Sequence, residues 1–149
     1  MKAKILIGLP MSGKSTYAKA NKGNAVIIDC DCIRMRLSGE DNKYKAFNKD
    51  NEAIVWRTFD DILNHCKHIN RDVIIANTNC NLGKLKVFLD IFKGSEIEFI
   101  IIDPPKSVCI SRLPSDAQHM VEIIDKMEEE MRVTCDWLVG NGMNVKVIS

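Results

Sequence analysis

The residues whose types and spacing could do chemistry begin eight positions into the chain. Gly8-Leu-Pro-Met-Ser-Gly-Lys-Ser15 matches the pattern G-x-x-x-x-G-K-[S/T] at every fixed position. In this pattern the loop turns its backbone N–H groups inward, while the lysine and the last hydroxyl reach phosphates and Mg²⁺. The segment therefore predicts a cradle for ATP or another nucleoside triphosphate, with Mg²⁺ as the accompanying ion.

The positions of this cradle have separate predicted roles. We expect Lys14 to reach the β- and γ-phosphates, the Ser15 hydroxyl to ligate Mg²⁺, and Thr16 to lie on the α-phosphate side. The predicted nucleotide-binding residues are Gly8, Ser12, Gly13, Lys14, Ser15 and Thr16. A chance match at a glycine turn is the alternative, and the apolar run before the loop and the helical pattern after it argue against chance.

A second group of chemical residues follows the second apolar run, in Asp29-Cys-Asp31-Cys-Ile-Arg34. If a helix opens at Asp31, Arg34 lies one turn away on the same face. A carboxylate beside the γ-phosphate can accept the proton of an attacking hydroxyl, and an arginine can bind a phosphate carried by the acceptor. The alternative is a helix cap at Asp31 and a surface charge at Arg34. The position at a strand end favours the functional interpretation.

Short apolar runs alternate with amphipathic segments along the whole chain. The predicted strands are 4–8, 25–29, 72–76, 98–103 and 145–148. The predicted helices are 14–21, 52–70, a helix capped by Asn81 and closed by Gly94, 106–112 and 120–138. Continuous apolar strands separated by helices indicate an α/β fold of three layers, with a central parallel sheet of about five strands and helices on both faces.

These strands are expected to bring distant polar residues together. Gly8, Asp29, Asn77-Thr78-Asn79 and Asp103 each stand at the end of a predicted strand. Ligands of open α/β sheets bind beyond the carboxyl ends of the strands. We therefore expect one site at that edge, to which Asn77, Thr78 and Asn79 contribute as substrate-binding residues.

Composition narrows the possible partners. The 149 residues fit one domain, 1–149, and the net charge of +1 disfavours an electrostatic grip on long duplex DNA. No apolar run approaches the roughly 20 residues that span a bilayer, and no signal peptide is recognised at the start, so no membrane partner and a cytoplasmic location are expected. The six cysteines lack the clustering of a metal site and are expected to be reduced thiols.

Taken together, the motifs resemble the 5′-hydroxyl polynucleotide kinase domain of the phage and animal end-healing enzymes. That P-loop family has G-x-P-G-S-G-K-S-T, then D-x-x-R, then D-T-N, and then an arginine-bearing lid. The matching segments here are Gly8–Thr16, Asp31–Arg34, Asn77–Asn79 and Arg112. The resemblance implies Asp31 as general base, Arg34 as a clamp on the 3′-phosphate of the acceptor, and Arg112 as a lid cation on the transferring phosphoryl group.

The chain differs from the family pattern at three places. Asn77 stands where the family has Asp, Met11 replaces a loop glycine, and Pro114-Ser-Asp116 follows where the family lid carries a further basic residue. A lysine-rich stretch with Lys43, Lys45 and Lys49 either contacts phosphates of the acceptor or, as the favoured interpretation, is a solvated face.

The predicted activity is Mg²⁺-dependent transfer of the γ-phosphoryl group of ATP to a hydroxyl, with Lys14, Asp31 and Arg112 as catalytic residues and with Asp31 and Arg34 also contacting the acceptor. A nucleic-acid 5′-hydroxyl or a nucleotide is the favoured acceptor. The first alternative is a kinase of a small molecule such as a nucleoside, a sugar or a modified base. The second is an ATP-binding module without turnover.

Overall fold

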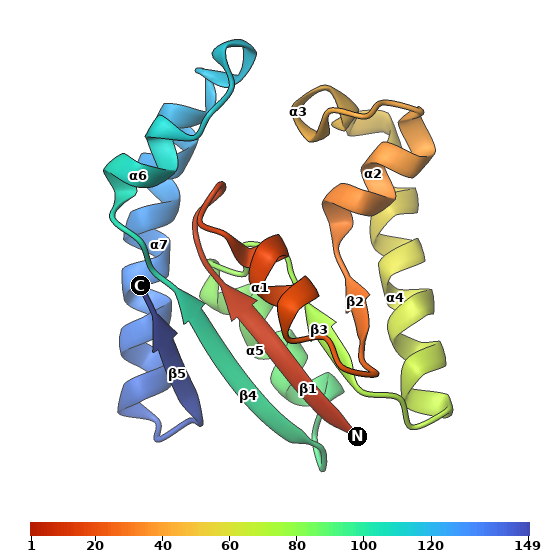
Figure 1. Cartoon of the computed structure of the whole chain (residues 1–149). Helices are drawn as coiled ribbons and strands as arrows, with labels where there is room; N and C mark the ends of the chain where they lie inside the picture. Colours follow the sequence, from red (N-terminus) through yellow and green to blue (C-terminus); the bar gives the residue numbers. More distant parts are fainter.

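The computed structural model describes residues 1–149, and its centre is one sheet of five parallel strands (Figure 1). The order across the sheet is β2-β3-β1-β4-β5. The strands are β1 (Lys2–Ile7), β2 (Val26–Ile28), β3 (Val73–Ile75), β4 (Glu96–Ile102) and β5 (Val145–Ile148). Because β1 is central, the loop that follows it lies between the segments that follow β3 and β4.

Helices connect successive strands and cover both faces of the sheet. They are α1 (Lys14–Ala20), α2 (Cys30–Ser38), α3 (Lys43–Ala46), α4 (Glu52–His68), α5 (Leu82–Ile91), α6 (Lys106–Ser111) and α7 (Met120–Gly140). Two single 3-10 turns, η1 (Lys49–Asn51) and η2 (Ser115–Ala117), precede α4 and α7. In Figure 1, α1 lies in front of the sheet and α5 behind it.

The strand side chains divide the core into two parts, as the period of two along a strand requires. Ala3, Ile5 and Ile7 of β1 belong to a cluster of 25 buried residues, which also contains apolar residues of α4, α5 and α7. Leu6 points the other way, into a cluster of seven residues that includes Ala18 of α1. Burial on both faces explains why the strands read as continuous apolar runs.

The connections beyond the carboxyl ends of the strands form two arms (Figure 1). The first arm, residues 30–51, contains α2, α3 and η1, and the second arm, residues 106–120, contains α6 and η2. The opposite edge of the sheet carries the amino end of the chain, where the Met1 ammonium group donates to Asn70 Oδ1 at 3.0 Å. No helix has the length and apolarity that crossing a membrane would require.

The predicted fold class and strand number are confirmed, and two local details differ. Helix α2 begins at Cys30 rather than at Asp31, because the Asp29 side chain caps it by accepting from the Asp31 N–H at 2.9 Å. The alternative that Asp31 is the helix cap is therefore wrong. Helix α3 was not predicted, since one turn of helix has no apolar period to reveal it.

Candidate functional site

A cleft of about 1560 Å³ opens above the carboxyl ends of the strands. It is lined by the loop after β1, the start of α2, the segment after β3 and parts of both arms. The structure thus brings together the sequence-predicted site residues Ser12, Gly13, Lys14, Ser15, Thr16, Asp31, Arg34, Asn77, Thr78, Asn79 and Arg112. Gly8 does not line the cleft.

Gly8 is required by packing beneath the loop. A Cβ atom at this position would lie 2.6 Å from Ser12 Oγ and 2.8 Å from the backbone oxygen of Ile102. The Gly8 N–H donates to the backbone oxygen of Thr78 at 3.0 Å, which ties the loop to the segment after β3. Gly8 therefore shapes the cradle from below, and its predicted role in nucleotide binding stays a prediction.

The start of α1 offers unpartnered backbone donors. Gly13 has φ 104°, in the left-handed region that favours glycine, and it caps α1 without any side-chain hydrogen bond. The N–H groups of Gly13, Lys14, Ser15 and Thr16 find no acceptor within the chain. Free donors of this kind at the positive end of a helix suit a phosphate group.

The Lys14 side chain is held in a buried position beside the loop. Its Nζ donates to the backbone oxygen of Leu9 at 2.7 Å and lies 3.4 Å from Ser12 Oγ. Burial is the main reason that the pKa of Lys14 is lowered to about 8. Lys14 has no carboxylate partner, so an anion in the cradle would provide the missing counter-charge.

Two neighbouring carboxylates mark the other side of the cleft. Asp29 is part of the α2 cap, and burial raises its pKa, with the charge of Asp31 as the next cause. Asp31 is more open, with 42% of its side chain exposed. The structure thus gives the capping role to Asp29 and leaves the Asp31 carboxylate available to a ligand in the cleft.

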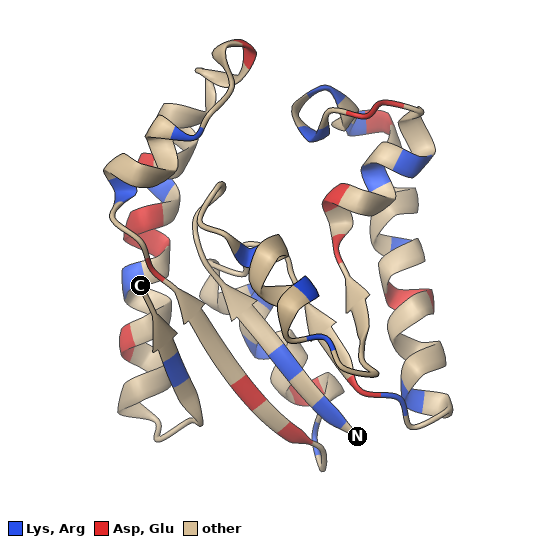
Figure 2. Ribbon diagram, viewed as in Figure 1, with Lys and Arg blue, Asp and Glu red and all other residues tan.

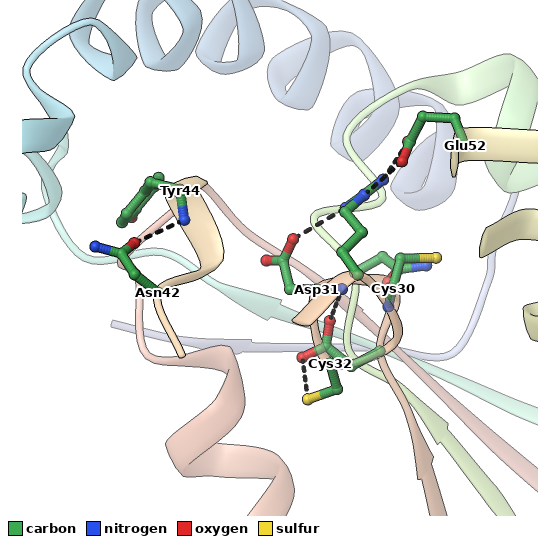
Figure 3. A network of polar contacts seen from close by, with 9 residues as sticks. Cys30, Asp31, Cys32, Asn42, Tyr44 and Glu52 are labelled. Carbon is green, nitrogen blue, oxygen red and sulfur yellow. Dashed lines mark hydrogen bonds and ion pairs between the residues drawn. The ribbon is translucent and has the colours of Figure 1, made fainter. Parts of the chain in front are cut away.

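Arg34 is held by two carboxylates at once (Figure 3). Its Nη1 donates to Asp31 Oδ1 at 2.9 Å, while Nε and Nη2 donate to the two oxygens of Glu52 at 3.0 and 2.8 Å. The hydrogen bonds to Glu52 are the largest cause that raises the pKa of Arg34 above its already high value. This fork fixes the plane of the guanidinium group and points one edge at Asp31.

Sequence analysis missed Glu52 as part of the site. It lies 18 residues after Arg34, on another helix, so no local spacing connects the two. Glu52 provides a carboxylate for the arginine where Asn77 lacks one. Asn77 itself accepts from the Cys30 N–H at 2.8 Å through Oδ1, and its buried Nδ2 has no partner.

The other two residues of the segment after β3 contribute through structural bonds. Asn79 Nδ2 donates to the backbone oxygen of Leu6 at 2.7 Å, and the backbone of Thr78 accepts from Gly8. The buried hydroxyl of Thr134 on α7 donates to the backbone oxygen of Cys80 at 2.6 Å. These bonds hold the floor of the cleft to β1 on one side and to α7 on the other.

We call residues 112–119 the lid segment. Arg112 Nη1 donates to the backbone oxygen of Met11 at 3.1 Å, so the lid segment touches the loop directly. Met11 has φ 67°, an uncommon conformation for a residue with a side chain. Asp116, at the tip of the segment, accepts from Asn42 Nδ2 of the first arm at 3.2 Å and lies 4.0 Å from Lys45 Nζ.

Several cations line the cleft, and the sequence did not distinguish those that face it. Lys43 and Lys84 are both lining residues and neither forms an ion pair, whereas Lys45 and Lys49 are exposed and do not line the cleft. Lys84 lies over the Trp56 ring, 5.4 Å from its centroid. The favoured prediction of a solvated face fits Lys45 and Lys49. It does not fit Lys43, which is half-buried and lines the cleft.

Solved structures provide the comparison for this geometry. A structure of the Pnkp1/Rnl/Hen1 complex is 25% identical, with a TM-score of 0.63, over 76% of this chain and 39% of the matched chain. Shikimate kinase from Aquifex aeolicus vf5 is 23% identical, with a TM-score of 0.59, over 100% of this chain and 85% of the matched chain. A structure of the PezAT toxin–antitoxin system of Streptococcus pneumoniae is 17% identical, with a TM-score of 0.69, over 97% of this chain and 66% of the matched chain.

The present chain therefore spans 39% of the matched Pnkp1/Rnl/Hen1 chain and 66% of the matched PezAT chain. No curated protein matches the sequence. The likenesses to shikimate kinase and to PezAT show the fold alone, because their identities are low. They agree with the α/β fold described above.

The family comparison covers most of the site. A model described as an AAA domain, AAA_33, matches residues 4–122, which run from β1 to the first residues of α7. The match contains the loop, Asp29 and Asp31, Arg34, Glu52 and the lid segment. With the Pnkp1 likeness, it confirms the resemblance to P-loop kinases. The chain belongs to the AAA domain family AAA_33.

Proposed function

We propose that this chain is one domain, residues 1–149, that transfers the γ-phosphoryl group of ATP to a hydroxyl group. The observation that carries the proposal is that the carboxylate of Asp31 lines the same cleft as the phosphate-binding loop. A polyphosphate cradle alone would bind a nucleotide. A carboxylate that is partly exposed across the cleft from it adds a base for the incoming alcohol.

The residues present fit ATP and Mg²⁺. Four free N–H groups and the buried Lys14 ammonium suit a polyphosphate, and the Ser15 hydroxyl is exposed at the start of α1. The chain has no cluster of three metal-ligating side chains. That fits Mg²⁺, which binds through one or two protein oxygens, substrate phosphates and water. Ser15 would hold the ion, and the half-buried carboxylate of Asp29 lines the same cleft. When bound, Mg²⁺ neutralises phosphate charge.

In the proposed mechanism the protein positions the reactants and moves one proton. Asp31 accepts the proton of the acceptor hydroxyl. At the same time the acceptor oxygen bonds to the γ-phosphorus, and the bond between the γ-phosphorus and the β–γ bridging oxygen breaks. The ion pair with Arg34 orients the Asp31 carboxylate. Lys14 and Arg112 contribute positive charge to the phosphoryl oxygens, where the charge of the transition state is spread.

For the acceptor we propose a nucleic-acid 5′-hydroxyl or a nucleotide. The likeness to the Pnkp1/Rnl/Hen1 complex and the D-x-x-R and x-T-N motifs support this choice. In this version Arg34 contacts a phosphate of the acceptor. One observation favours a phosphate-free small molecule as the second candidate, because three donors of Arg34 already bind Asp31 and Glu52.

The base is tested with Asp31→Asn in a screen for transfer of labelled γ-phosphate. The screen offers 5′-hydroxyl oligonucleotides, nucleoside 3′-monophosphates, modified-base DNA, nucleosides and sugars side by side. Asp31→Asn should lower kcat by about a thousandfold or more while the Kd for ATP changes little. Asp41→Asn changes an exposed aspartate outside the cleft and serves as the matched control. Normal turnover by Asp31→Asn would contradict the assignment.

Arg34→Ala separates the two acceptor candidates. If Arg34 binds a phosphate of the acceptor, the variant raises KM at least about tenfold for an acceptor with a 3′-phosphate and little for the same acceptor without it. If the acceptor lacks phosphate, both acceptors respond alike, through the loss of orientation of Asp31. If the unmodified chain transfers phosphate to no acceptor, the proposed function fails, and the alternative of a nucleotide-binding module without turnover is supported.

A further inference from the structure

Lys43 is a half-buried cation without a carboxylate partner in the cleft that we propose binds ATP. It is the first residue of α3, and it lines the same cleft as the loop after β1. Its Nζ lies 5.2 Å from the centroid of the Tyr44 ring. Arg34, by contrast, already binds two carboxylates. An ammonium group without a carboxylate partner gains more from an anionic ligand than one that is already paired.

The charge of Lys43 reaches both halves of the site. After burial, it is among the lesser causes that lower the pKa of Lys14. It also opposes the rise in the pKa of Asp29 that burial produces. Because Lys43 lines the same cleft as Lys14 and Asp29, it is placed to interact with a group held between them.

One asparagine side chain fixes α3 and also joins it to the lid segment. Asn42 Oδ1 accepts from the Tyr44 N–H at 2.9 Å, which caps α3. Asn42 Nδ2 donates to Asp116 Oδ2 at 3.2 Å, across the mouth of the cleft. Figure 2 shows the same relation as charge, with basic residues on α3 and an acidic residue at the tip of the second arm. Lys43 and Arg112 are thus carried by segments in direct contact.

We propose that Lys43 binds the γ-phosphoryl group from the side opposite Arg112, and that the Asn42–Asp116 bond positions it there. This proposal rests on the function proposed above. Lys43 takes no part in the proton transfer, because the proton of the acceptor hydroxyl goes to Asp31 and the phosphoryl group passes from the bridging oxygen of ATP to the acceptor oxygen. The three cations Lys14, Lys43 and Arg112 then surround the phosphoryl oxygens from three separate elements.

The first test compares nucleotides that differ only by the γ-phosphate. Calorimetry measures the Kd of a non-hydrolysable ATP analogue and of ADP, each with Mg²⁺, for the full chain and for Lys43→Met. The variant should bind the triphosphate at least about tenfold more weakly and ADP within about twofold of the unmodified chain. Lys43→Arg, which keeps a cation, should recover most of the loss. An equal loss for both nucleotides, or none for the triphosphate, would overturn the proposal.

Lys49→Met is the matched control because Lys49 is exposed and lies outside the cleft. It should leave both dissociation constants unchanged. A loss with Lys49→Met equal to that with Lys43→Met would show a general effect of net charge and would count against a contact by Lys43.

Turnover distinguishes failure of this proposal from failure of the proposed function. If no hydroxyl acceptor is phosphorylated, the proposed function fails, yet the triphosphate-to-ADP comparison still decides the role of Lys43. If transfer is observed, Lys43→Met should lower kcat by about a hundredfold with little change in the KM of the acceptor. A rise in that KM alone, confined to acceptors that carry a phosphate, would place Lys43 on the acceptor and reject the proposal.

The positioning step has its own test. Asn42→Ser keeps a residue that caps α3 but removes the amide that reaches Asp116. Asn42→Ser and Asp116→Ala should each raise the Kd of the ATP analogue about threefold. The double variant should raise this Kd no further than either single variant. Independent, additive losses would show that the bond does not position Lys43.

Discussion

At the scale of single residues, the acceptor side depends on a carboxylate that no local motif reveals. Glu52 binds two nitrogens of Arg34, and only 18% of the arginine side chain and 23% of the glutamate side chain are exposed. Partial burial makes such a pair costly to break, because the remaining charge is left without its partner. The Asn77 amide cannot provide that charge.

Glu52→Gln tests this role. The variant keeps the shape of the side chain but removes its charge, so the guanidinium group is free to turn away from Asp31. We expect the free energy of unfolding in urea to fall by about 1–2 kcal/mol and kcat to fall with it. Glu40→Gln alters an exposed glutamate without a side-chain partner and should change neither quantity. Equal stability of the two variants would contradict the role of Glu52.

We expect Lys14 to couple the proposed nucleotide binding to proton uptake. Below a pH of about 8 this lysine is charged in both the folded and the unfolded chain. Between about 8 and 10.5 the unfolded chain holds more protons, so the free energy of unfolding contributed by Lys14 rises with pH. A bound polyphosphate favours the ammonium form and reverses this lowering of the pKa.

Binding of a non-hydrolysable ATP analogue at about pH 9 should therefore take up nearly one proton, and binding at about pH 7 should take up almost none. Calorimetry in two buffers of different ionisation enthalpy measures the uptake. Lys14→Arg should show none at either pH, because arginine stays charged. Uptake at pH 9 that persists in this variant would assign the proton to another group.

At the scale of elements, α7 supports the cleft through Thr134, which does not line the cleft but bonds to Cys80, which does. Thr134 is fully buried, and its hydroxyl donates to the backbone oxygen of Cys80, directly after the Asn77–Asn79 segment. Thr134→Val keeps the volume of the side chain and leaves that oxygen unpaired. We expect the free energy of unfolding to fall by about 1–2 kcal/mol, measured in urea.

Thr58→Val is the matched control for this change. Thr58 donates to the backbone oxygen of Ile54 within its own helix, at an exposed position. Its loss should cost less than about 0.5 kcal/mol. If the free energy of unfolding falls equally in both valine variants, the hydrogen bond between α7 and the segment after β3 stabilises the fold no more than the bond within α4.

The elements were largely predictable from sequence, and their side-chain partners were not. Periodicity and the glycine loop predicted all five strands, and Asn81 was correctly placed as the cap of α5. Helix α3 was missed because four residues carry no repeat. Glu52 and the Asn42–Asp116 bond join segments that are distant in sequence, and a single sequence contains no signal for such pairs. The roles of Asp31, Arg34 and Arg112 stay predictions.

At the scale of the whole molecule, the two arms are coupled across the mouth of the cleft. The Asn42–Asp116 bond and the contact of Arg112 with Met11 connect the first arm, the lid segment and the loop. A ligand that engages Arg112 and Lys43 together therefore orders both arms. A ligand that reaches only the loop has less effect on them.

Hydrogen exchange measured by mass spectrometry tests this coupling. A non-hydrolysable ATP analogue should slow amide exchange in residues 42–47 and in residues 112–119, while ADP should slow it mainly in residues 8–16. Asp116→Ala should reduce the protection of residues 42–47 by the ATP analogue. Protection of one arm without the other would contradict the coupling.

The position of the chain ends has a practical consequence for these experiments. Ile148 and Ser149 line the cleft, whereas Met1 lies at the opposite edge of the sheet and is bonded to Asn70. A purification tag or a surface tether attached after Ser149 would emerge beside the cleft. It would interfere with assays that depend on ligands entering the cleft. The same attachment at the amino end leaves the cleft facing the solution, and it is the orientation to choose for immobilised binding measurements.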